Sequence, residues 1–302
     1  MRVENPKLLA ALRDLGVQHR PGERLAHWTS LGVGGTTDIL VVHQPRALPE
    51  LIRLLEAEGL PRRFLGGGSN LLVREGELAW VFLHLSSKNA EPEFHGKRVR
   101  VPAAADLGRT VTFCARQNLG GVEALIGVPG SVGGALRMNA GAYGIEISQF
   151  IRSVELYRGA TMKIETLPPQ ALGFRYRQSG VGPGDILISA EIELEEKPYQ
   201  EIRDTIRMCN QKRRASQPLS EKSAGCIFKN PAGASAGKMI EELGLKGHRM
   251  GGAVVSERHA NFFVNRFQAT ADDLLRLIEF VRRRIREAFG YELEEEVIVW
   301  AD

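Results

Sequence analysis

Three short segments of the sequence carry side chains that could take part in proton transfer or stabilise a developing anion. Arg177 lies in GFRYRQSG (173–180), Cys226 in SAGCIFKNP (223–231) and Glu296 in the terminal segment LEEEVIVW (293–300). A forked guanidinium suits a carboxylate or a developing enolate. A thiol titrating near ~8.5 can release a proton, and a desolvated carboxyl group can stay protonated. These three residues are the candidate catalytic groups.

Each of the three residues also has a plainer interpretation. Arg177 could form an ordinary surface ion pair, and Cys226, after Gly225 in an otherwise apolar run, could be a buried and inert thiol. Glu296 belongs to an acidic triplet of a kind that usually faces water. We predict that residues 293–300 form the terminal strand, in which alternation turns only one carboxylate of the triplet toward an enclosed site.

Polar residues close to Cys226 are candidates for holding an anionic substrate. Lys229, Asn230 and Lys238 supply charge and amide donors next to Gly233 and Gly237, at the entrance to a helix predicted near 236–243. The start of a helix attracts phosphate. Lys212 and Arg213, at the basic end of the preceding predicted helix, are further candidates.

Two glycine-rich segments of different pattern predict a binding site built from the backbone. The first is FLGGGSNLLV (64–73), which is typical of a strand, a tight loop and a second strand, and the other is GVEALIGVPGSVGGALRMNAGAYG (121–144). Glycines let peptide N–H groups approach a ligand closely, and consecutive amides form a concave anion site. One such cluster could be merely a turn or a close packing of strands. Two clusters favour a phosphate or pyrophosphate ligand, although neither contains a P-loop or a dinucleotide G-x-G-x-x-G motif.

The composition excludes several other classes of protein. The chain has 302 residues, a net charge of +4 and three widely spaced cysteines, Cys114, Cys209 and Cys226, without a C-x-x-C pair. We therefore expect a reducing, cytoplasmic setting, no structural disulfides and no metal site. Basic residues are spread along the chain, so charge does not indicate nucleic acid. No run of 18 apolar residues predicts a membrane span.

Hydrophobic periodicity places these segments in an α+β chain of three domains. We predict domain bounds of 1–85, 86–198 and 199–302, with the glycine clusters on the first two domains. The basic run from Arg282 to Arg286 alternates with apolar residues at helical spacing and predicts a solvated helix face. Helices are predicted at 6–15, 45–58, 105–118, from Tyr199 to the basic segment 212–214 and near 236–243, and strands at 37–42, 63–65, 98–102, 151–157, 161–166 and 186–194.

Taken together and in this order, the motifs resemble those of the UDP-N-acetylenolpyruvoylglucosamine reductase family. The resemblance spans nearly the whole chain and includes TSLGVGGTTDIL, FLGGGSNLLV, IGVPGSVGGALRMNAGAYG, FRYRQSG, SAGCIFKNP, SAGKMIEELGLKG, HANFFVN and LEEEV. It implies a two-domain FAD-binding fold of the p-cresol methylhydroxylase/vanillyl-alcohol oxidase type, followed by an α+β substrate domain. The short connection before Tyr199 resembles the shorter, type II subtype.

The resemblance also implies the ligands. FAD would be held without a covalent bond, since no histidine stands in or beside GGGSN, and NADPH would supply electrons. A UDP-sugar would be the other small-molecule substrate, with Lys212, Arg213, Lys229, Asn230 and Lys238 as its contacts. The implied FAD-binding residues are Gly66, Gly67, Gly68, Ser69, Asn70, Leu71, Gly127, Pro129, Gly130, Ser131, Gly133, Gly134, Asn139, Ala140 and Gly141.

By matching position, the resemblance assigns roles to the three candidate catalytic groups. Hydride from N5 of reduced FAD would add to the enolpyruvyl group, Arg177 and Glu296 would stabilise the resulting carbanion, and Cys226 would protonate it. The commoner family pattern has serine where this chain has Cys226. The activity implied is NADPH-dependent reduction of UDP-N-acetylglucosamine enolpyruvate to UDP-N-acetylmuramate for peptidoglycan synthesis.

Two alternatives stay open on the sequence. Another FAD-dependent oxidase or dehydrogenase of the same fold would keep the glycine clusters without the three catalytic groups. A regulator that only binds a nucleotide or phosphate would be colourless when purified. We expect no nucleic-acid or membrane partner and favour a monomer.

Overall fold

The structure is a computed structural model and describes residues 2–88 and 90–300. Within these residues the chain forms two units, each of which collects segments far apart in the sequence. Unit 1 contains residues 2–22, 38–67 and 79–211 apart from residue 89, and unit 2 contains residues 23–37, 68–78 and 212–300. The domain bounds at 85 and 198 stay a prediction.

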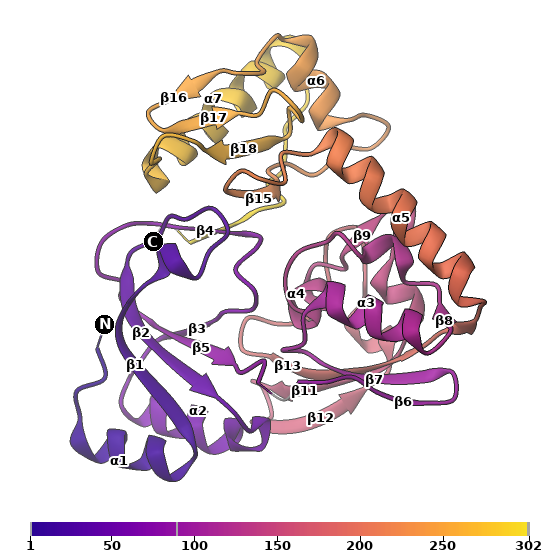
Figure 1. The fold of residues 1–302 in the computed structure, drawn as a ribbon. Helices are drawn as coiled ribbons and strands as arrows, with labels where there is room; N and C mark the ends of the chain where they lie inside the picture. Colours follow the sequence, from indigo (N-terminus) through magenta and orange to yellow (C-terminus); the bar gives the residue numbers. More distant parts are fainter. Residues whose placement is uncertain (1, 89, 301–302) are drawn as a thin grey trace. The chain divides into compact units, whose positions relative to one another are not determined.

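Unit 1 contains a small α/β layer, drawn in indigo and violet in Figure 1. Its sheet has the strand order β1-β2-β5-β3, with β2 and β3 parallel to β5. The apolar faces of two helices bury leucines against this sheet in one core. The elements are α1 (Pro6–Asp14), β1 (Val17–Arg24), β2 (Thr36–Val42), α2 (Leu48–Ala57), β3 (Arg62–Phe64) and β5 (Val81–Leu85), and the end of β1 and start of β2 belong to unit 2.

The rest of unit 1 is an antiparallel sheet with the order β12-β11-β13-β7-β6. Figure 1 shows α3 and α4 on the same side of this sheet, where their apolar residues share a core with the strands. The predicted antiparallel layer is therefore confirmed. Its bounds are β6 (Glu93–His95), β7 (Arg98–Pro102), α3 (Leu107–Arg116), α4 (Val132–Arg137), β11 (Ile151–Arg158), β12 (Lys163–Leu167) and β13 (Ile186–Glu193).

Short elements complete the connections of the chain. Two-residue strands pair as β8 (Leu119–Gly120) with β14 (Glu195–Glu196) and β9 (Gly141–Ala142) with β10 (Ile145–Glu146). Single turns of 3-10 helix occur at Leu25–His27, Pro45–Ala47, Glu123–Leu125, Ile147–Phe150 and Pro169–Leu172. Helix α5 (Tyr199–Ser216) begins in unit 1, and its residues from Lys212 onward belong to unit 2.

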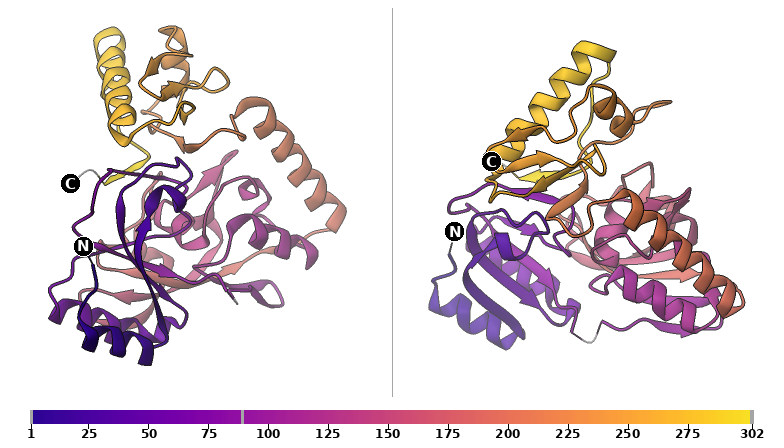
Figure 2. Two further views of the ribbon diagram at one scale, coloured as in Figure 1. Left: turned by 60° about the vertical axis from the view of Figure 1, so that its left-hand side comes forward. Right: turned by 45° about the horizontal axis from the view of Figure 1, so that its top comes forward.

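Unit 2 contains an antiparallel sheet with the order β15-β18-β17-β16 and a separate parallel pair, β4 with β19. Both views in Figure 2 show α7 running beside the four-stranded sheet. The bounds are β4 (Leu71–Val73), β15 (Ser223–Cys226), α6 (Ala236–Glu242), β16 (Arg249–Met250), β17 (Ala253–Val255), β18 (Phe262–Asn265), α7 (Ala271–Phe289) and β19 (Ile298–Trp300).

Local sequence signals explain where α7 begins and ends. Thr270 and Asp273 form a reciprocal capping box, and Gly290 ends the helix in the left-handed region at a φ of 73°. Leu274, Leu277, Ile278, Val281 and Ile285 repeat at helical spacing and are buried in the core of unit 2. Among the helices of the described residues, none has the length and apolar character needed to cross a membrane.

One sequence prediction for the C-terminal segment is wrong. The strand predicted over 293–300 forms only at β19, because the carbonyl of Glu294 and the amide of Glu296 bond instead to Lys229 and Ile227.

The solvated helix face predicted for the basic run is confirmed at three positions, since Arg283, Arg284 and Arg286 are exposed. Arg282 is the exception, because it pairs with Glu279 and Glu295 and its side chain is only 23% exposed.

Candidate active site

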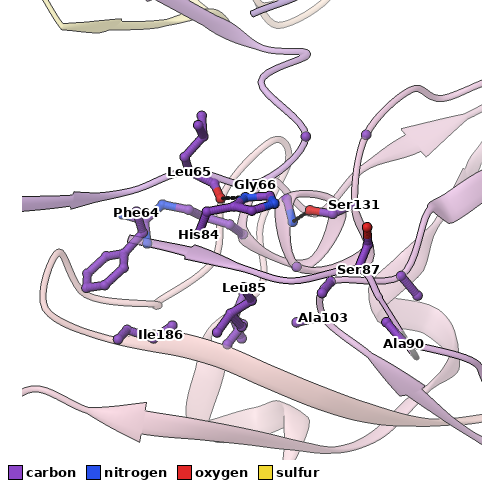
Figure 3. Close-up of a pocket in the computed structure, with 18 of the residues that line it drawn as sticks. Phe64, Leu65, Gly66, His84, Leu85, Ser87, Ala90, Ala103, Ser131 and Ile186 are labelled. Carbon is purple, nitrogen blue, oxygen red and sulfur yellow. Dashed lines mark hydrogen bonds between the residues drawn. The ribbon is translucent and has the colours of Figure 1, made fainter. Parts of the chain in front are cut away.

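Unit 1 contains a pocket of about 530 Å³ where the first glycine-rich loop meets the second. Gly66 and Gly67 follow β3, and Gly130 and Ser131 precede α4. Figure 3 shows Ser131 and Ser87 on one side of the pocket and Phe64 and Ile186 on the other. The pocket thus has a polar end made of loops and an apolar wall made of strand residues.

The two loops approach so closely that side chains would not fit. A Cβ on Gly67 would lie 2.7 Å from the Cα of Gly130, and one on Gly66 would lie 2.8 Å from the Oγ of Ser131. Among the described residues, the amides of Gly66 and Gly67 make no hydrogen bond to the protein. Unused amides beside an apolar wall fit a dinucleotide cofactor such as FAD, because they can bind its pyrophosphate while the wall packs on a flat ring.

His84, on β5, holds the main chain at Leu65, where the first glycine-rich loop begins. The sequence analysis did not predict this residue. Its Nδ1 lies 2.9 Å from the carbonyl oxygen of Leu65, so this nitrogen carries the proton and donates. Burial lowers the pKa of His84 below its usual value, and the nearby charge of Arg20 lowers it further. His84 is therefore neutral at pH 7. Its position in the alternating segment VFLHL was the available signal.

Arg137 is a second pocket residue that sequence reasoning missed. It is the last residue of α4 and lies inside the second glycine-rich segment, between the predicted positions Gly134 and Asn139. Burial lowers the pKa of its guanidinium, and the charge of Asp185 offsets part of that effect. The signal in the sequence was a single cation within an otherwise neutral glycine-rich block.

The predicted cofactor residues from Gly68 to Leu71 belong to unit 2. Gly68 has a φ of 63°, and a Cβ there would lie 1.8 Å from the carbonyl oxygen of Trp28, so glycine is required. The side-chain amide of Asn70 donates to the carbonyl oxygen of Glu296 over 2.9 Å. Leu71 starts β4 and is buried. The loop thus supports the segment that carries a candidate catalytic carboxyl group.

Cys226 and Glu296 lie on neighbouring segments of unit 2. The carbonyl oxygen of Ile227, the residue after Cys226, accepts from the amides of Glu296 (2.7 Å) and Val297 (3.3 Å). Cys226 ends β15 after Gly225, whose φ is 78°, and it is half-buried rather than enclosed in the core. Main-chain hydrogen bonds thus join the segments that carry the two residues, and their sharing of a site stays a prediction.

Arg177 lies in unit 1 at the tip of a tight turn in which Arg175 and Gln178 exchange main-chain hydrogen bonds. Its Nη2 donates to the carbonyl oxygen of Gly141 at 2.9 Å, and its guanidinium lies 4.9 Å from the ring centroid of Tyr176. The side chain is 18% exposed. These contacts orient the guanidinium and leave it partly accessible.

Backbone strain concentrates around Arg177. Three non-glycine residues of this region have positive φ values, Asn139 at 42°, Tyr143 at 54° and Arg177 at 52°. Each such residue costs roughly 1–3 kcal/mol and persists only where neighbours enforce it. The buried Asn139 side chain enforces the arrangement here by donating to Glu146 and to the carbonyl oxygen of Arg175. Asn139, predicted to contact the cofactor, therefore also organises the turn that carries Arg177.

Other predicted cofactor residues surround these loops. Within the described residues, Gly133 and Gly134 line the pocket, whereas Gly127, Pro129, Ala140 and Gly141 do not. Gly141 is needed for close approach, since a Cβ would lie 2.7 Å from the carbonyl oxygen of Ile145 and 3.2 Å from Nη1 of Arg177. The middle of the second glycine-rich segment thus lines the pocket, and its last part contacts Arg177.

The predicted substrate-binding residues all belong to unit 2. The Nζ of Lys229 lies 3.1 Å from the carboxylate of Glu294, and the side-chain oxygen of Asn230 accepts from the amide of Ala236 at the start of α6. Arg213 donates to Gln217 from α5, the helix that also carries Lys212. Lys238 lies in the first turn of α6, capped by Ser235. Their contact with a substrate stays a prediction.

Comparison with known proteins decides the family. Residues 38–166 match the family model described as FAD binding domain, and residues 217–300 match the C-terminal domain of UDP-N-acetylenolpyruvoylglucosamine reductase. UDP-N-acetylenolpyruvoylglucosamine reductase 2 of Symbiobacterium thermophilum is 39% identical over 297 residues, which cover 97% of this chain and 96% of that protein. The chain belongs to the UDP-N-acetylenolpyruvoylglucosamine reductase family. The predicted family is confirmed.

Solved structures agree with membership of the UDP-N-acetylenolpyruvoylglucosamine reductase family. The crystal structure of the reductase from Thermus caldophilus matches with a TM-score of 0.80 and 37% identity, covering 94% of this chain and 98% of that one. A Thermotoga relative of the same name is 39% identical over 97% of this chain. Berberine bridge enzyme, at 18% identity and a TM-score of 0.50, shares the fold over 65% of this chain and 44% of its own. The predicted α+β FAD-binding fold and the predicted FAD cofactor are confirmed.

Proposed function

We propose that the chain reduces UDP-N-acetylglucosamine enolpyruvate to UDP-N-acetylmuramate with NADPH, in the cytoplasm, for peptidoglycan synthesis. The observation that carries this proposal is the main-chain bonding of Ile227 to Glu296, which sets a thiol residue and a carboxyl residue side by side next to Asn70. A pure flavin oxidase has no need of a proton donor for a reduced double bond. Near-full-length relatives that carry the reductase name support the substrate.

The proposal divides the work between the cofactor and the protein. Bound FAD, held by the glycine amides of the pocket, would carry two electrons from NADPH to the enolpyruvyl double bond. Arg177 and Glu296 would stabilise the negative charge that develops beside the substrate carboxylate, and Cys226 would protonate the adjacent carbon. A preorganised stabiliser of this kind lowers the activation barrier by roughly 3 kcal/mol. A positioned acid accelerates the reaction by about 10²- to 10⁴-fold.

Lys212, Arg213, Lys229, Asn230 and Lys238 would bind the UDP-sugar. Four of these side chains are cations from α5, α6 and the segment after β15, so they can neutralise a diphosphate. When the substrate binds, Lys229 would leave Glu294 and pair with a phosphate oxygen instead. The ion pair between Lys229 and Glu294 is weak enough for this change, because it is exposed to water.

The test separates the two halves of the reaction by following flavin absorbance in a stopped-flow instrument. In Cys226→Ala, NADPH should bleach the flavin at the normal rate, whereas UDP-N-acetylglucosamine enolpyruvate should restore the colour at least about 100-fold more slowly. Cys226→Ser keeps a proton donor and serves as the matched control. Normal reoxidation of the alanine variant would rule out the assigned role of Cys226.

Glu296→Gln tests the carboxyl group in the same assay. It should slow reoxidation by about 100-fold and leave reduction by NADPH unchanged. Rapid oxygen consumption by the wild type, with no response to the enolpyruvyl substrate, would point instead to an oxidase of the same fold.

A further inference from the structure

The pocket of unit 1 is lined by a half-buried cation, Arg137, and a buried carboxylate, Asp185, for which the proposed reaction has no use. Arg137 and Asp185 both line the pocket, and both contact Gly182: the guanidinium donates to its carbonyl oxygen and the carboxylate accepts from its amide. Asp185 directly precedes Ile186, the first residue of β13, which Figure 3 shows across the pocket from Ser131. Asp185 therefore lies next to a residue of the apolar wall, and Arg137 lines the same pocket from the end of α4.

The guanidinium of Arg137 is poorly satisfied by the protein. Among the described residues its side chain makes one hydrogen bond, from Nη1 to the carbonyl oxygen of Gly182, and that bond is long at 3.4 Å. A guanidinium carries five N–H donors. Arg137 is half-buried, and none of its nitrogens is among the described buried atoms that lack a partner. Its remaining donors are therefore accessible to a molecule bound in the pocket, which can supply acceptors for them.

Asp185 acts on Arg137 through its charge, and no hydrogen bond between the two side chains is seen among the described residues. Its carboxylate accepts from the amides of Gly159 (2.9 Å) and Gly182 (3.0 Å), and Nη1 of Arg158 lies 4.0 Å away. A carboxylate anchored by two amides is a stationary charge. It holds the loop before β13 in place and attracts the guanidinium of Arg137 from a fixed point.

The chemistry around Arg137 indicates which part of a dinucleotide reaches it. Phe64, Leu85 and Ile186 form an apolar wall suited to a flat base, and the glycine amides at the other end suit a pyrophosphate. Within the described residues, Arg177, the candidate catalytic cation, does not line this pocket. The half of the cofactor that reacts must lie near the catalytic groups, so this pocket receives the other half.

We propose that Arg137 binds the adenosine half of FAD by donating to a ring nitrogen of adenine or an oxygen of its ribose, and so determines that the protein takes FAD rather than FMN. This inference rests on the flavin chemistry of the proposed function. Adenosine offers several acceptors and no cationic group, which suits a guanidinium that has unused donors. FMN lacks the adenosine and gains nothing from Arg137.

The experiment measures cofactor binding to protein stripped of flavin, without substrate or NADPH. Fluorescence titrations with FAD and FMN, and competition of FAD by ADP, would be run on the wild type and on Arg137→Met, which keeps the chain length and removes the donors. We expect the variant to bind FAD and ADP about 10- to 100-fold more weakly, the range for losing a hydrogen bond from a charged group. FMN affinity should not change, which also shows that the variant is folded.

Arg109→Met is the matched control, because Arg109 is exposed and lines the same pocket. Its FAD affinity should change by less than about threefold, as expected for a screened surface charge. Equal losses in both variants, equal losses of FAD and FMN, or an unchanged FAD affinity in Arg137→Met would each overturn the inference. Because no turnover is measured, an inactive protein that binds FAD contradicts only the proposed function.

Discussion

The side-chain amide of Asn70 donates a hydrogen bond of 2.9 Å to the main-chain oxygen of Glu296, a residue 226 positions later in the sequence. The amide of Ile298, two residues further on, donates to the carbonyl oxygen of Asn70. The two bonds extend the parallel pairing of β4 with β19. A loop that the sequence associates with the cofactor therefore fixes the backbone of a candidate catalytic carboxyl group.

We predict that Asn70→Ala slows flavin reoxidation by the enolpyruvyl substrate more than it slows reduction by NADPH. Losing one hydrogen bond costs about 1 kcal/mol, so reoxidation should fall about fivefold. Stopped-flow absorbance measures both rates. Ser256→Ala, which removes a 3.2 Å bond that the hydroxyl of Ser256 accepts from the amide of Arg258 elsewhere in unit 2, is the control. Equal slowing of both half-reactions would contradict a specific link between Asn70 and Glu296.

Gly67→Ala should abolish stable FAD binding. Its new methyl group would lie 2.7 Å from the Cα of Gly130 and 3.1 Å from the amide nitrogen of Ser131, and main-chain atoms cannot move aside cheaply. The purified variant should be colourless, as judged by absorbance near the flavin band. Gly96→Ala is the control, since it carries only the backbone penalty of a φ of 61° in open space. A yellow Gly67→Ala protein would show that the two loops do not form the pyrophosphate site.

Asp38 should make unit 1 sensitive to acid. Burial raises the pKa of its carboxyl group, but donors from the amides of Val3 and Gly22 and from His19 outweigh this, so the net shift is downward. A lowered folded-state pKa gives stability that is present above the unfolded value near ~3.9 and is lost as pH falls through the folded value. Asp38→Asn should cost about 1.5–3 kcal/mol at pH 7, with little difference from the wild type near pH 2.

Thermal unfolding followed by circular dichroism at the two pH values measures the effect of Asp38→Asn. Asp272→Asn is the control, because that side chain is 72% exposed and its ion pair with Arg276 is screened by water. If the melting temperatures of the wild type and Asp38→Asn differ by the same amount at pH 7 and at pH 2, the stability does not depend on ionisation of Asp38.

The cysteines should differ in reactivity. Burial raises the pKa of the Cys114 thiol to about 12, so almost no thiolate exists at pH 8, whereas Cys226 is half-buried. We expect iodoacetamide at pH 8 to label Cys226 first and Cys114 only after unfolding, as read by peptide mass spectrometry. Early labelling of Cys114 in the native protein would mean that its core is open.

Local signals explain what the sequence could predict. The glycine clusters, the caps of α7 and the alternation of β7, β11 and β13 depend on neighbouring residues, so they could be located without a structure. The pairing of β4 with β19 could not, because apolar periodicity marks a strand but not its partner. For the same reason 293–297 was wrongly predicted as strand. Arg137 was missed because a cation at a helix end usually faces solvent.

Unit 2 is built from three separate segments of the chain, and its strand β4 pairs with β19 (Ile298–Trp300). During synthesis, residues up to Trp300 must leave the ribosome before β4 can pair, whereas every residue of the pocket in unit 1 has emerged by Leu187. Units generally fold as their segments become available. The pocket can therefore form while the segments that carry Cys226 and Glu296 are still being translated, so assembly of the glycine loops of unit 1 does not depend on the candidate catalytic residues of unit 2.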